Sequence, residues 1–327
     1  MDVTLPEGLE AFLDRAGWAG ALVEPLPGDA SFRRYFRIRK GERTAMLMDA
    51  PPPHEDPEPF LRAGRWLDDN GMRPPRILAD DARRGLVLLE DFGEVRMRDS
   101  LDEWPQDEAE IYTAAVDTLK DLHRLPAGPF LDYSLQEYQR EARLFLDWYC
   151  PAQNLYVDLR SWTSAWDAVL TTMLPRQRPG VTVLRDYHAE NIMLLGSLHK
   201  QGLLDFQDAL VGHRAYDLVS LLQDARRDVS PQLEQAMLAH YLKGEPDPET
   251  FLADYARIGA QRNAKIVGIF VRLWRRDGKP RYLSLIPRVW ALLERDLAHP
   301  ALAPVADWFS ENIPAELRTA GGGVWNP

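Results

Sequence analysis

Residues 184–206 constrain the fold more than any other part of the chain. A short apolar run, Ile192–Leu195, is followed by a polar stretch with a glycine at each end, Gly196–Gly202, and then by a second apolar pair, Leu203–Leu204. Two short apolar runs on either side of such a turn are typical of a β-hairpin. The sequence therefore predicts a hairpin here, inside a chain whose neighbouring segments are mostly helical in pattern.

Polar residues stand at both open ends of this hairpin. If Leu195 pairs with Gly202, Asn191 at the start of the first strand lies beside Asp205 or Phe206 at the end of the second. The predicted register brings an amide oxygen and a carboxylate together.

An amide and a carboxylate are hard oxygen ligands, which suit Mg²⁺ that is held partly by substrate phosphates. Phosphoryl transfer also needs a group that orients the acceptor hydroxyl, and Asp186 in the preceding loop fits that role. Alone, the pair Asp186 and Asn191 is better explained by a loop aspartate before a strand-capping asparagine. The hairpin, Asp205 and the following Tyr216-Asp217-Leu218 favour phosphoryl transfer instead.

This segment resembles the catalytic core of the aminoglycoside phosphotransferase and choline kinase superfamily, whose loop reads His-Gly-Asp-x-His-x-x-Asn before a hairpin and an acid. The resemblance implies that Asp186 is the catalytic aspartate and His188 the second loop histidine. It also implies that Asn191 and Asp205 are metal ligands and that Asp217 is a buried support of the loop. Mg²⁺ and ATP are the implied cofactor and co-substrate.

The chain departs from the family pattern in two places. Leu184 and Arg185 replace the usual His-Gly, so the hydrogen bonding inside the loop is open to question. The strand 44–49, which should carry a phosphate-binding lysine, contains none. Strand alternation places Arg34 on the same face as apolar neighbours, where it either binds phosphate or extends to solvent.

Further residues resemble parts of a nucleotide site. Ser31 follows Gly28-Asp29-Ala30, which is similar to the serine-containing nucleotide loop of small-molecule kinases. Glu90 ends an apolar strand at the position of the family's hinge, whose backbone holds the adenine. We therefore interpret Ser31, Arg34 and Glu90 as ATP-binding. Glu58 is a candidate for the helical glutamate that usually pairs with the lysine.

The pattern of elements predicts an α+β, two-lobed protein-kinase-like fold. Strands dominate residues 1–90, the expected nucleotide-binding lobe, and helices dominate residues 91–327, the expected catalytic and substrate-binding lobe. Helices are expected at 57–70 and 135–149, among others.

Composition narrows the function class. The net charge of -11 argues against a nucleic-acid or membrane-surface binder. No run approaches the roughly 20 apolar residues of a membrane span, and no targeting segment or obligate protein partner is evident, so a soluble, cytoplasmic protein is expected. Cys150, the one cysteine, reads as a buried structural thiol.

Charge distribution bears on the acceptor. The segment 257–288 carries nine basic residues and one acid, Asp277, in an otherwise acidic chain. Such a segment favours an anionic or neutral acceptor over a polycation, although any single basic residue is as well explained by a solvated helix face.

The stretches SFRRYFRI, MLMDAPP, LLQDARRDV and GAQRNAKIVGIFVRLWRRDGKPRYL resemble the group of bacterial kinases that phosphorylate N-acetylmuramate and N-acetylglucosamine at the anomeric hydroxyl during peptidoglycan recycling. The resemblance implies a sugar 1-phosphate product destined for UDP-sugars. Candidate sugar-binding residues are His188, Glu190, Asp224, Arg227 and Asn263. Two alternatives remain: a pseudokinase, suggested by the missing lysine, and a kinase of an amino alcohol or aminoglycoside.

Overall fold

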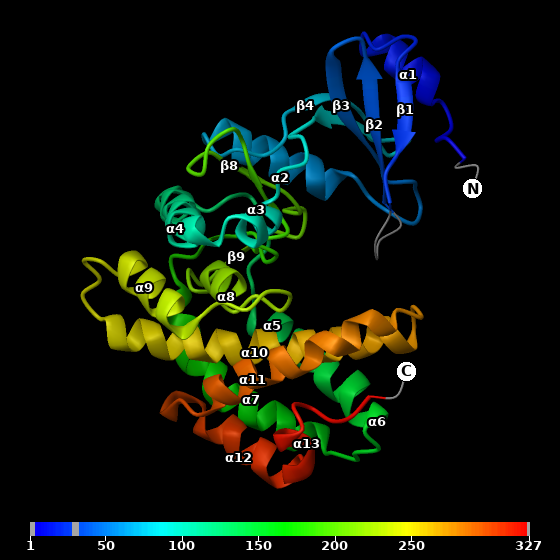
Figure 1. Ribbon diagram of the computed structural model, residues 1–327. Coiled ribbons are helices and arrows are strands. Elements are labelled where there is room, and N and C mark those ends of the chain that lie inside the picture. The colour runs from blue at the N-terminus through cyan, green and yellow to red at the C-terminus, as the bar shows by residue number, and fades with distance from the viewer. Residues whose placement is uncertain (1–3, 28–32, 326–327) are drawn as a thin grey trace. The chain divides into compact units, whose positions relative to one another are not determined.

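The computed structural model describes residues 4–27 and 33–325. Packing divides the chain into two compact units (Figure 1): unit 1 comprises residues 1–115 and 190–209, and unit 2 comprises residues 116–189 and 210–327. These units are defined by packing, whereas the expected boundary after residue 90 separates nucleotide binding from catalysis. That functional boundary stays a prediction.

Unit 1 is built on an antiparallel five-stranded sheet with the strand order β1-β2-β3-β5-β4. A separate two-stranded hairpin, β7-β8, belongs to the same unit. The elements of unit 1 are β1 (Leu22–Pro25), β2 (Arg34–Lys40), β3 (Arg43–Asp49), β4 (Ile77–Asp81), β5 (Leu86–Glu90), β7 (Ile192–Leu194), β8 (Gln201–Leu203), α1 (Leu9–Arg15), α2 (Glu58–Asp69), α3 (Met97–Glu103), a 3-10 turn (Pro105–Asp107) and the start of α4 (Glu108–Arg124).

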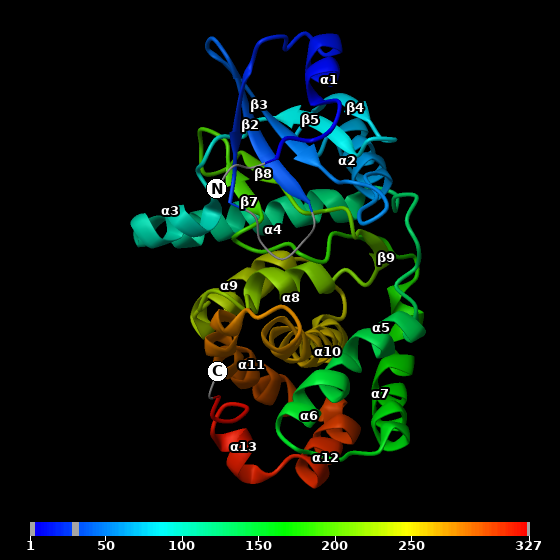
Figure 2. The same ribbon diagram turned by 90° about the vertical axis from the view of Figure 1, so that its right-hand side faces the viewer.

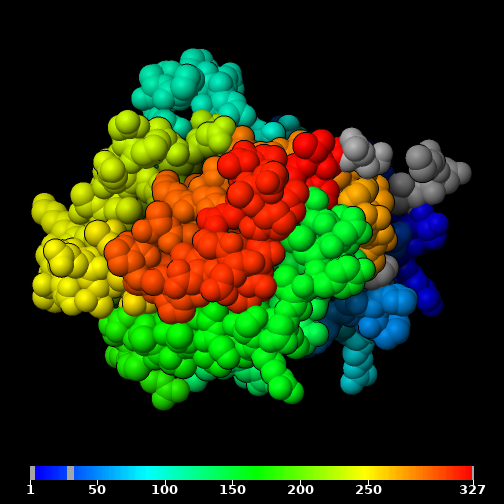
Figure 3. All heavy atoms as spheres, turned by 90° about the horizontal axis from the view of Figure 1, so that it is seen from below, coloured from blue at the N-terminus to red at the C-terminus, as the bar shows by residue number. Residues whose placement is uncertain are grey.

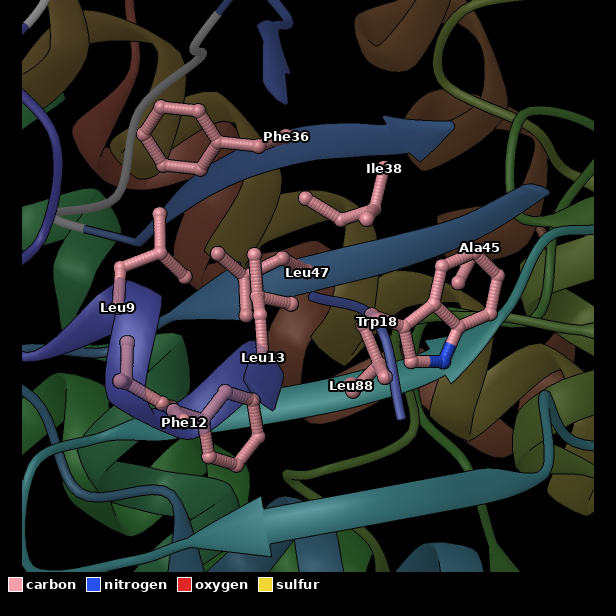
Figure 4. Close-up of a cluster of buried hydrophobic side chains, with 10 residues drawn as sticks. Leu9, Phe12, Leu13, Trp18, Phe36, Ile38, Ala45, Leu47 and Leu88 are labelled. Carbon is pink, nitrogen blue, oxygen red and sulfur yellow. The ribbon is translucent and has the colours of Figure 1, made fainter. Parts of the chain in front are cut away.

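Alternation along the strands gives the sheet two different faces. One face packs against α1, and Figure 4 shows Phe12 and Leu13 of α1 in one cluster with Phe36, Ile38 and Leu47 of the sheet. The cluster is completed by Leu9, Trp18, Ala45, Leu86 and Leu88. Burial of these apolar side chains is the main term that stabilises the sheet.

The opposite face of the sheet is set by the strand register. Tyr35 pairs with Met48, and Met48 pairs with Val87 across the next strand, so these three side chains share the face that α1 does not cover. Met48 and Val87 are fully buried. The unit therefore has apolar packing on both faces of the sheet.

Helix α2 confirms the expected helix at 57–70 to within one residue at each end. It ends where Gly71 adopts a φ of 79°, a left-handed conformation that suits glycine after a helix. Phe60 of this helix stacks on Phe206, with 4.9 Å between the ring centroids. The segment that follows β8 is thereby fixed against α2.

Unit 2 is mostly helical, with one pair of three-residue strands, β6 and β9. Its elements are the remainder of α4, α5 (Leu135–Ala142), a π-helical turn (Phe145–Tyr149), α6 (Cys150–Ala152), α7 (Leu159–Met173), β6 (Val181–Val183), β9 (Leu210–Gly212), α8 (Tyr216–Leu222), α9 (Pro231–Tyr241), α10 (Pro248–Arg275), α11 (Ile286–Leu297), α12 (Ala303–Asn312), α13 (Ala315–Thr319) and 3-10 turns at Leu174–Gln177, Pro280–Leu285 and Pro300–Leu302.

Helix α10, with 28 residues, is the centre of unit 2. Figure 2 shows it nearly end-on, surrounded by α5, α8 and α11. Gly268 allows this close packing, since a Cβ there would lie 2.3 Å from the backbone of Leu144. The expected helix 135–149 is interrupted at the same place: α5 ends at Ala142, and the Phe145–Tyr149 segment forms a π-helical turn where α10 approaches.

The C-terminal helix α12 packs against α7 in the core of unit 2. In Figure 3 the residues of α12 and α13, in red, lie beside the green segment that includes α6 and α7, and α12 packs on α7. Phe309 of α12 is fully buried and contacts both Phe145 and Trp162. Among the residues described, no helix combines the length and apolar character that crossing a membrane would require.

Candidate active site

The predicted hairpin forms, with a tighter register than expected. Met193 pairs with Gly202, and the Leu195 amide donates to the carbonyl of Lys200 at 2.8 Å, so Leu195 faces Lys200 and not Gly202. The predicted pairing was wrong by two residues because the turn is shorter. A shift of two keeps every side chain on its own face of the hairpin.

The shorter register still brings the two proposed metal ligands together in unit 1. Nδ2 of Asn191 lies 3.3 Å from Oδ2 of Asp205, and the Leu204 amide donates to the Asn191 carbonyl at 2.9 Å. Asp205 is exposed and adopts a φ of 58°, which is uncommon for a residue other than glycine. Gln207 donates to its other carboxylate oxygen at 2.9 Å.

This donor set fits Mg²⁺. An amide oxygen and a carboxylate are hard ligands, and Mg²⁺ is usually bound by one or two protein groups together with phosphates and water. The residues that the structure describes contain no group of three or more His, Cys, Asp or Glu side chains arranged to hold a metal ion. The binding of Mg²⁺ by Asn191 and Asp205, together with a nucleotide, stays a prediction.

The loop before the hairpin belongs to unit 2, and Asp217 forms hydrogen bonds with its backbone. The carboxylate of this fully buried residue accepts hydrogen bonds from the backbone N–H of Leu184 at 2.6 Å and of Arg185 at 2.8 Å. Burial raises the pKa of Asp217 to about 7, although both backbone donors lower it. Asp217 thus contacts the backbone of the loop that carries Asp186, and its role as a support of that loop stays a prediction.

Arg185 stands at the position of the usual glycine and adopts the backbone conformation that favours glycine. Its φ is 74°, a left-handed conformation that glycine adopts more easily. The guanidinium pairs with the buried carboxylate of Glu141 on α5. Lys265 of α10 lies 3.0 Å from the same carboxylate and donates to the hydroxyl of Tyr216 at 3.1 Å. The strained residue is therefore anchored by charge from another helix.

Glu141 was not identified from the sequence. It stands three residues after Tyr138 and is, like Tyr138, on the buried face of α5. An acid on the apolar face of a predicted helix is a signal that a partner of opposite charge is needed.

Asp186 is partly exposed at the end of this loop. Burial raises the pKa of its carboxyl, but nearby positive charges, chiefly Lys265 and also Arg262 and Arg185, bring the pKa below the ordinary aspartate value. The carboxylate is therefore ionised at neutral pH. An ionised carboxylate can accept a hydrogen bond from a substrate hydroxyl and take its proton.

His188 is buried beside Asp186 in the same unit. Nη1 of Arg226 donates to its Nε2 at 3.3 Å, which leaves the proton of the neutral ring on Nδ1. Burial is the largest cause of its lowered pKa, against the charges of Asp224 and Asp186, which raise it. A neutral imidazole next to an ionised carboxylate can position a substrate without adding positive charge.

A cavity of about 240 Å³ opens between the end of α8 and α11, within unit 2. Two predicted sugar-binding residues, Asp224 and Arg227, line it together with Arg288. Asp224 accepts a hydrogen bond from the Arg226 amide at 2.8 Å through Oδ1. Within the described part of the chain, its buried Oδ2 has no hydrogen-bond partner.

The remaining predicted sugar-binding residues contact protein groups. Asn263 is fully buried in α10 and donates to Gln223 at 2.7 Å and to Asp296 at 3.1 Å. Glu190, in unit 1, pairs with Arg98 at 2.9 Å. The roles predicted for these two residues stay predictions, and their contacts here are with side chains of the protein.

Two of the three residues predicted to bind ATP, Arg34 and Glu90, lie in unit 1. The third, Ser31, falls outside the described residues. Arg34 is held by Asp49, with Nη2 at 2.6 Å from Oδ2, and by the carbonyl of Thr4 at 2.7 Å. Glu90 accepts two hydrogen bonds from Arg73, one of them at 2.8 Å. Their binding of ATP stays a prediction.

Sequence comparison matches residues 22–257 to the phosphotransferase enzyme family. A protein of Caulobacter vibrioides named N-acetylmuramate/N-acetylglucosamine kinase is 37% identical, over 94% of this chain and 96% of its own length. A protein of Pseudomonas aeruginosa with the same name is 39% identical, over 94% of this chain and 93% of its own length. These relatives match the chain nearly from end to end.

Structural comparison finds the same fold in distant proteins. A choline/ethanolamine kinase family protein from Mesorhizobium loti superposes with a TM-score of 0.64 at 16% identity, over 91% of this chain and 96% of its own. The choline kinase LicA from Streptococcus pneumoniae gives 0.61 at 13% identity, over 86% of this chain and 99% of its own. The α+β, protein-kinase-like fold that the sequence predicted is confirmed.

Proposed function

We propose that this chain phosphorylates an amino sugar with ATP, because the chain belongs to the phosphotransferase enzyme family. Membership of that family implies ATP as the co-substrate. The observation that carries the proposal is the Asn191–Asp205 pair, 3.3 Å apart, in a chain that aligns over 94% of its length with relatives named N-acetylmuramate/N-acetylglucosamine kinase.

In this proposal, different site residues bind the metal ion, accept the proton and hold the loop. Asn191 and Asp205 would hold Mg²⁺, which neutralises charge on the phosphates of the nucleotide. Asp186 orients the acceptor hydroxyl and accepts its proton as the oxygen attacks the γ-phosphorus, and the bond between that phosphorus and the β-phosphate oxygen breaks to release ADP. Asp217 and Glu141 keep the loop that carries Asp186 in place.

We assign the anomeric C1 hydroxyl of N-acetylmuramate or N-acetylglucosamine as the acceptor, which gives a sugar 1-phosphate for peptidoglycan recycling. An anomeric hydroxyl is more acidic than an ordinary alcohol, so an aspartate is a sufficient base. N-acetylmuramate also carries a lactyl carboxylate. Arg227 and Arg288 at the 240 Å³ cavity are cations that could receive such a group.

In this proposal the sugar is bound by Asp224, which lines the same cavity, and by His188 of the loop that carries Asp186. The buried Oδ2 of Asp224 can accept a hydrogen bond from a hydroxyl or an amide N–H, and His188 can donate from Nδ1. Glu190 and Asn263 are weaker candidates, because both contact protein side chains. We place the reaction in the cytoplasm, where ATP is available.

The test is phosphorus NMR of the purified protein with Mg-ATP and one acceptor at a time. The acceptors are N-acetylmuramate, N-acetylglucosamine, choline and kanamycin. A sugar 1-phosphate signal split by the anomeric proton establishes both the reaction and its position. Product with choline or kanamycin alone would show that the acceptor is an amino alcohol or an aminoglycoside and not an amino sugar. Binding of ATP without product from any acceptor would show that the chain is a pseudokinase and not an enzyme.

A further inference from the structure

Three helices of unit 2 meet at a group of buried polar side chains beside the 240 Å³ cavity. Gln223 follows the last turn of α8 and lines the cavity, Asn263 lies on α10, and Asp296 lies on α11. None of these three residues is more than 4% exposed. Buried polar groups cost free energy unless they are hydrogen-bonded, so their partners matter.

Hydrogen bonds join every pair within this group, which we call the Gln223 network. Nε2 of Gln223 donates to Oδ1 of Asp296 at 3.0 Å. Nδ2 of Asn263 donates to Oε1 of Gln223 at 2.7 Å and to Oδ2 of Asp296 at 3.1 Å. Because buried hydrogen bonds are costly to break, α10 and α11 together hold the Gln223 side chain in one position.

A glycine makes room for the Gln223 network between α10 and α11. Gly259 stands one helical turn before Asn263 on α10. A Cβ at this position would lie 2.4 Å from Oδ2 of Asp296. Any side chain at residue 259 would displace that carboxylate, so the packing of the two helices and the position of Asp296 depend on each other.

The Gln223 network holds the residue that directly precedes Asp224. The backbone N–H of Gln223 donates to the Val219 carbonyl at 2.8 Å, so Gln223 is fixed by its backbone as well as by its side chain. The N–H of Arg226 donates to Oδ1 of Asp224 at 2.8 Å. The buried Oδ2 of Asp224 has no hydrogen-bond partner among the residues that the structure describes. The position of that oxygen at the cavity therefore follows from the position of Gln223.

The segment after Gln223 also connects the cavity to the loop that carries Asp186. Arg226, whose backbone bonds to Asp224, lies with Nη1 at 3.3 Å from Nε2 of His188. His188 follows Asp186 by two residues in the loop. Asp224 is thus joined to this loop through one residue, Arg226, and all of them belong to unit 2.

We propose that Asn263 and Asp296 are positioning residues for the sugar: through Gln223 they fix Asp224, whose Oδ2 accepts a hydrogen bond from a hydroxyl or amide N–H of the sugar. This role rests on the proposed function, which assigns Asp224 to the sugar. Asn263 then influences the sugar through Gln223 and Asp224 and does not contact it. Positioning of this kind matters because a small displacement of a binding group weakens the interaction sharply.

Steady-state kinetics with MgATP and either N-acetylglucosamine or N-acetylmuramate provide the test. Asp224→Asn keeps the oxygen that accepts from Arg226 and replaces the other by an amide nitrogen, so the KM for the sugar should rise by about tenfold or more. Asn263→Ala should raise it by about three- to tenfold, because Asp224 is still present but less well fixed. The KM for MgATP should stay within about twofold in both variants, since the residues proposed to bind the nucleotide belong to unit 1.

The double variant Asn263→Ala/Asp224→Asn distinguishes positioning from direct contact. If Asn263 acts through Asp224, its removal has no further effect once the Oδ2 acceptor is gone. The double variant should then have the sugar KM of Asp224→Asn to within about twofold. If Asn263 contacts the sugar by itself, the two losses should multiply to about thirtyfold or more, and the positioning role would be overturned.

Gln261→Ala is the matched control. Gln261 is fully buried on the same helix and donates to the Tyr138 carbonyl at 2.9 Å, so this variant also loses a buried hydrogen bond but leaves the Gln223 network intact. It should lower the thermal unfolding temperature, as Asn263→Ala does, and leave the KM for the sugar unchanged. Gln223→Met removes the hydrogen bonds of the Gln223 side chain and keeps its volume, and it replaces Asn263→Ala if that variant fails to fold.

The outcomes separate this proposal from the proposed function. Wild-type protein that phosphorylates neither sugar would overturn the proposed function itself. Turnover by the wild type, with an unchanged sugar KM in Asn263→Ala, would overturn only the positioning role. An unchanged sugar KM in Asp224→Asn would remove the contact through which Asn263 is proposed to act. Equal increases in the KM for the sugar and the KM for MgATP would mean that Asn263 supports the fold and not the sugar site.

Discussion

The carboxylate of Asp217 accepts a hydrogen bond from the backbone of Arg185 at 2.8 Å, and Arg185 stands at a φ of 74°. The acceptor, Asp217, is 32 positions away from Arg185 in sequence, and this hydrogen bond fixes the backbone immediately before Asp186. A non-glycine residue in the left-handed region costs roughly 1 kcal/mol or more. The loop is therefore held in a conformation that its own residues would not choose.

Asp217→Ala should reduce both stability and turnover. The change leaves the N–H groups of Leu184 and Arg185 without their acceptor, and each such buried group costs about 1–3 kcal/mol. We expect kcat to fall far more than the affinity for MgATP, because the loop carries Asp186, whereas the residues that we propose to bind the nucleotide belong to unit 1. Urea denaturation and steady-state kinetics measure the two effects.

Asp158→Ala is the matched control for this variant. Asp158 also accepts a backbone hydrogen bond, from Ser161 at 2.9 Å, but it caps α7 at the surface. The substitution Asp158→Ala should lower the free energy of unfolding by about 1 kcal/mol and leave kcat unchanged. Equal kinetic losses in the two variants would mean that Asp217 acts through general stability alone.

Asp186→Asn should remove turnover and keep nucleotide binding. The amide cannot accept the proton of the sugar hydroxyl, and loss of a general base lowers kcat by roughly 10²–10⁴-fold. The Kd for MgATP should stay within about twofold, since no charge at the metal ligands changes. Asp147→Asn, a change at an exposed acid paired with Arg143 on the surface, should have wild-type kinetics. Near-normal turnover in Asp186→Asn would remove Asp186 from the mechanism.

Asp205→Asn should weaken the response to Mg²⁺. The substitution exchanges a charged oxygen ligand for a neutral one, so the Mg²⁺ concentration for half-maximal activity should rise by about tenfold or more. Excess Mg²⁺ should recover part of the rate. Asp69→Asn changes an exposed acid elsewhere in unit 1 and should leave the Mg²⁺ titration where it was. A titration curve that does not move in Asp205→Asn would exclude this residue as a ligand.

The sequence predicted the hairpin, its two polar ends and the buried support at Asp217, because each depends on local pattern and on a resemblance confined to a few residues. The predicted register of the hairpin was wrong, since a turn two residues shorter leaves the same alternation of side chains. The ion pairs that Arg33 and Glu141 form were not predicted from the sequence. Both depend on a partner distant in sequence, Glu55 for one and Lys265 for the other. Strands of three residues such as β6 and β9 are too short to show periodicity.

Asp296 should make the stability of the protein depend on pH. Burial raises its pKa to about 8, even though Gln223 donates to its carboxylate. The unfolded chain loses this proton near pH 4, whereas the folded chain keeps it until about pH 8. Over that interval the folded state binds more protons, so stability falls as pH rises, by up to about 1.4 kcal/mol per pH unit.

Asp296→Asn should remove the contribution of Asp296 to this fall, because the amide does not titrate, and should leave the contribution of Asp217, whose pKa burial raises to about 7. Urea denaturation at pH 5, 6.5 and 8 should show that the free energy of unfolding of the variant, relative to that of the wild type, increases with each step in pH. Asp228→Asn gives the control: hydrogen bonding from Arg288 lowers the pKa of the exposed Asp228, so its contribution is lost only in acid, and its difference from the wild type should be constant from pH 5 to 8. A constant difference for Asp296→Asn as well would mean that Asp296 is ionised throughout, and that its hydrogen bonds from Gln223 and Asn263 outweigh its burial.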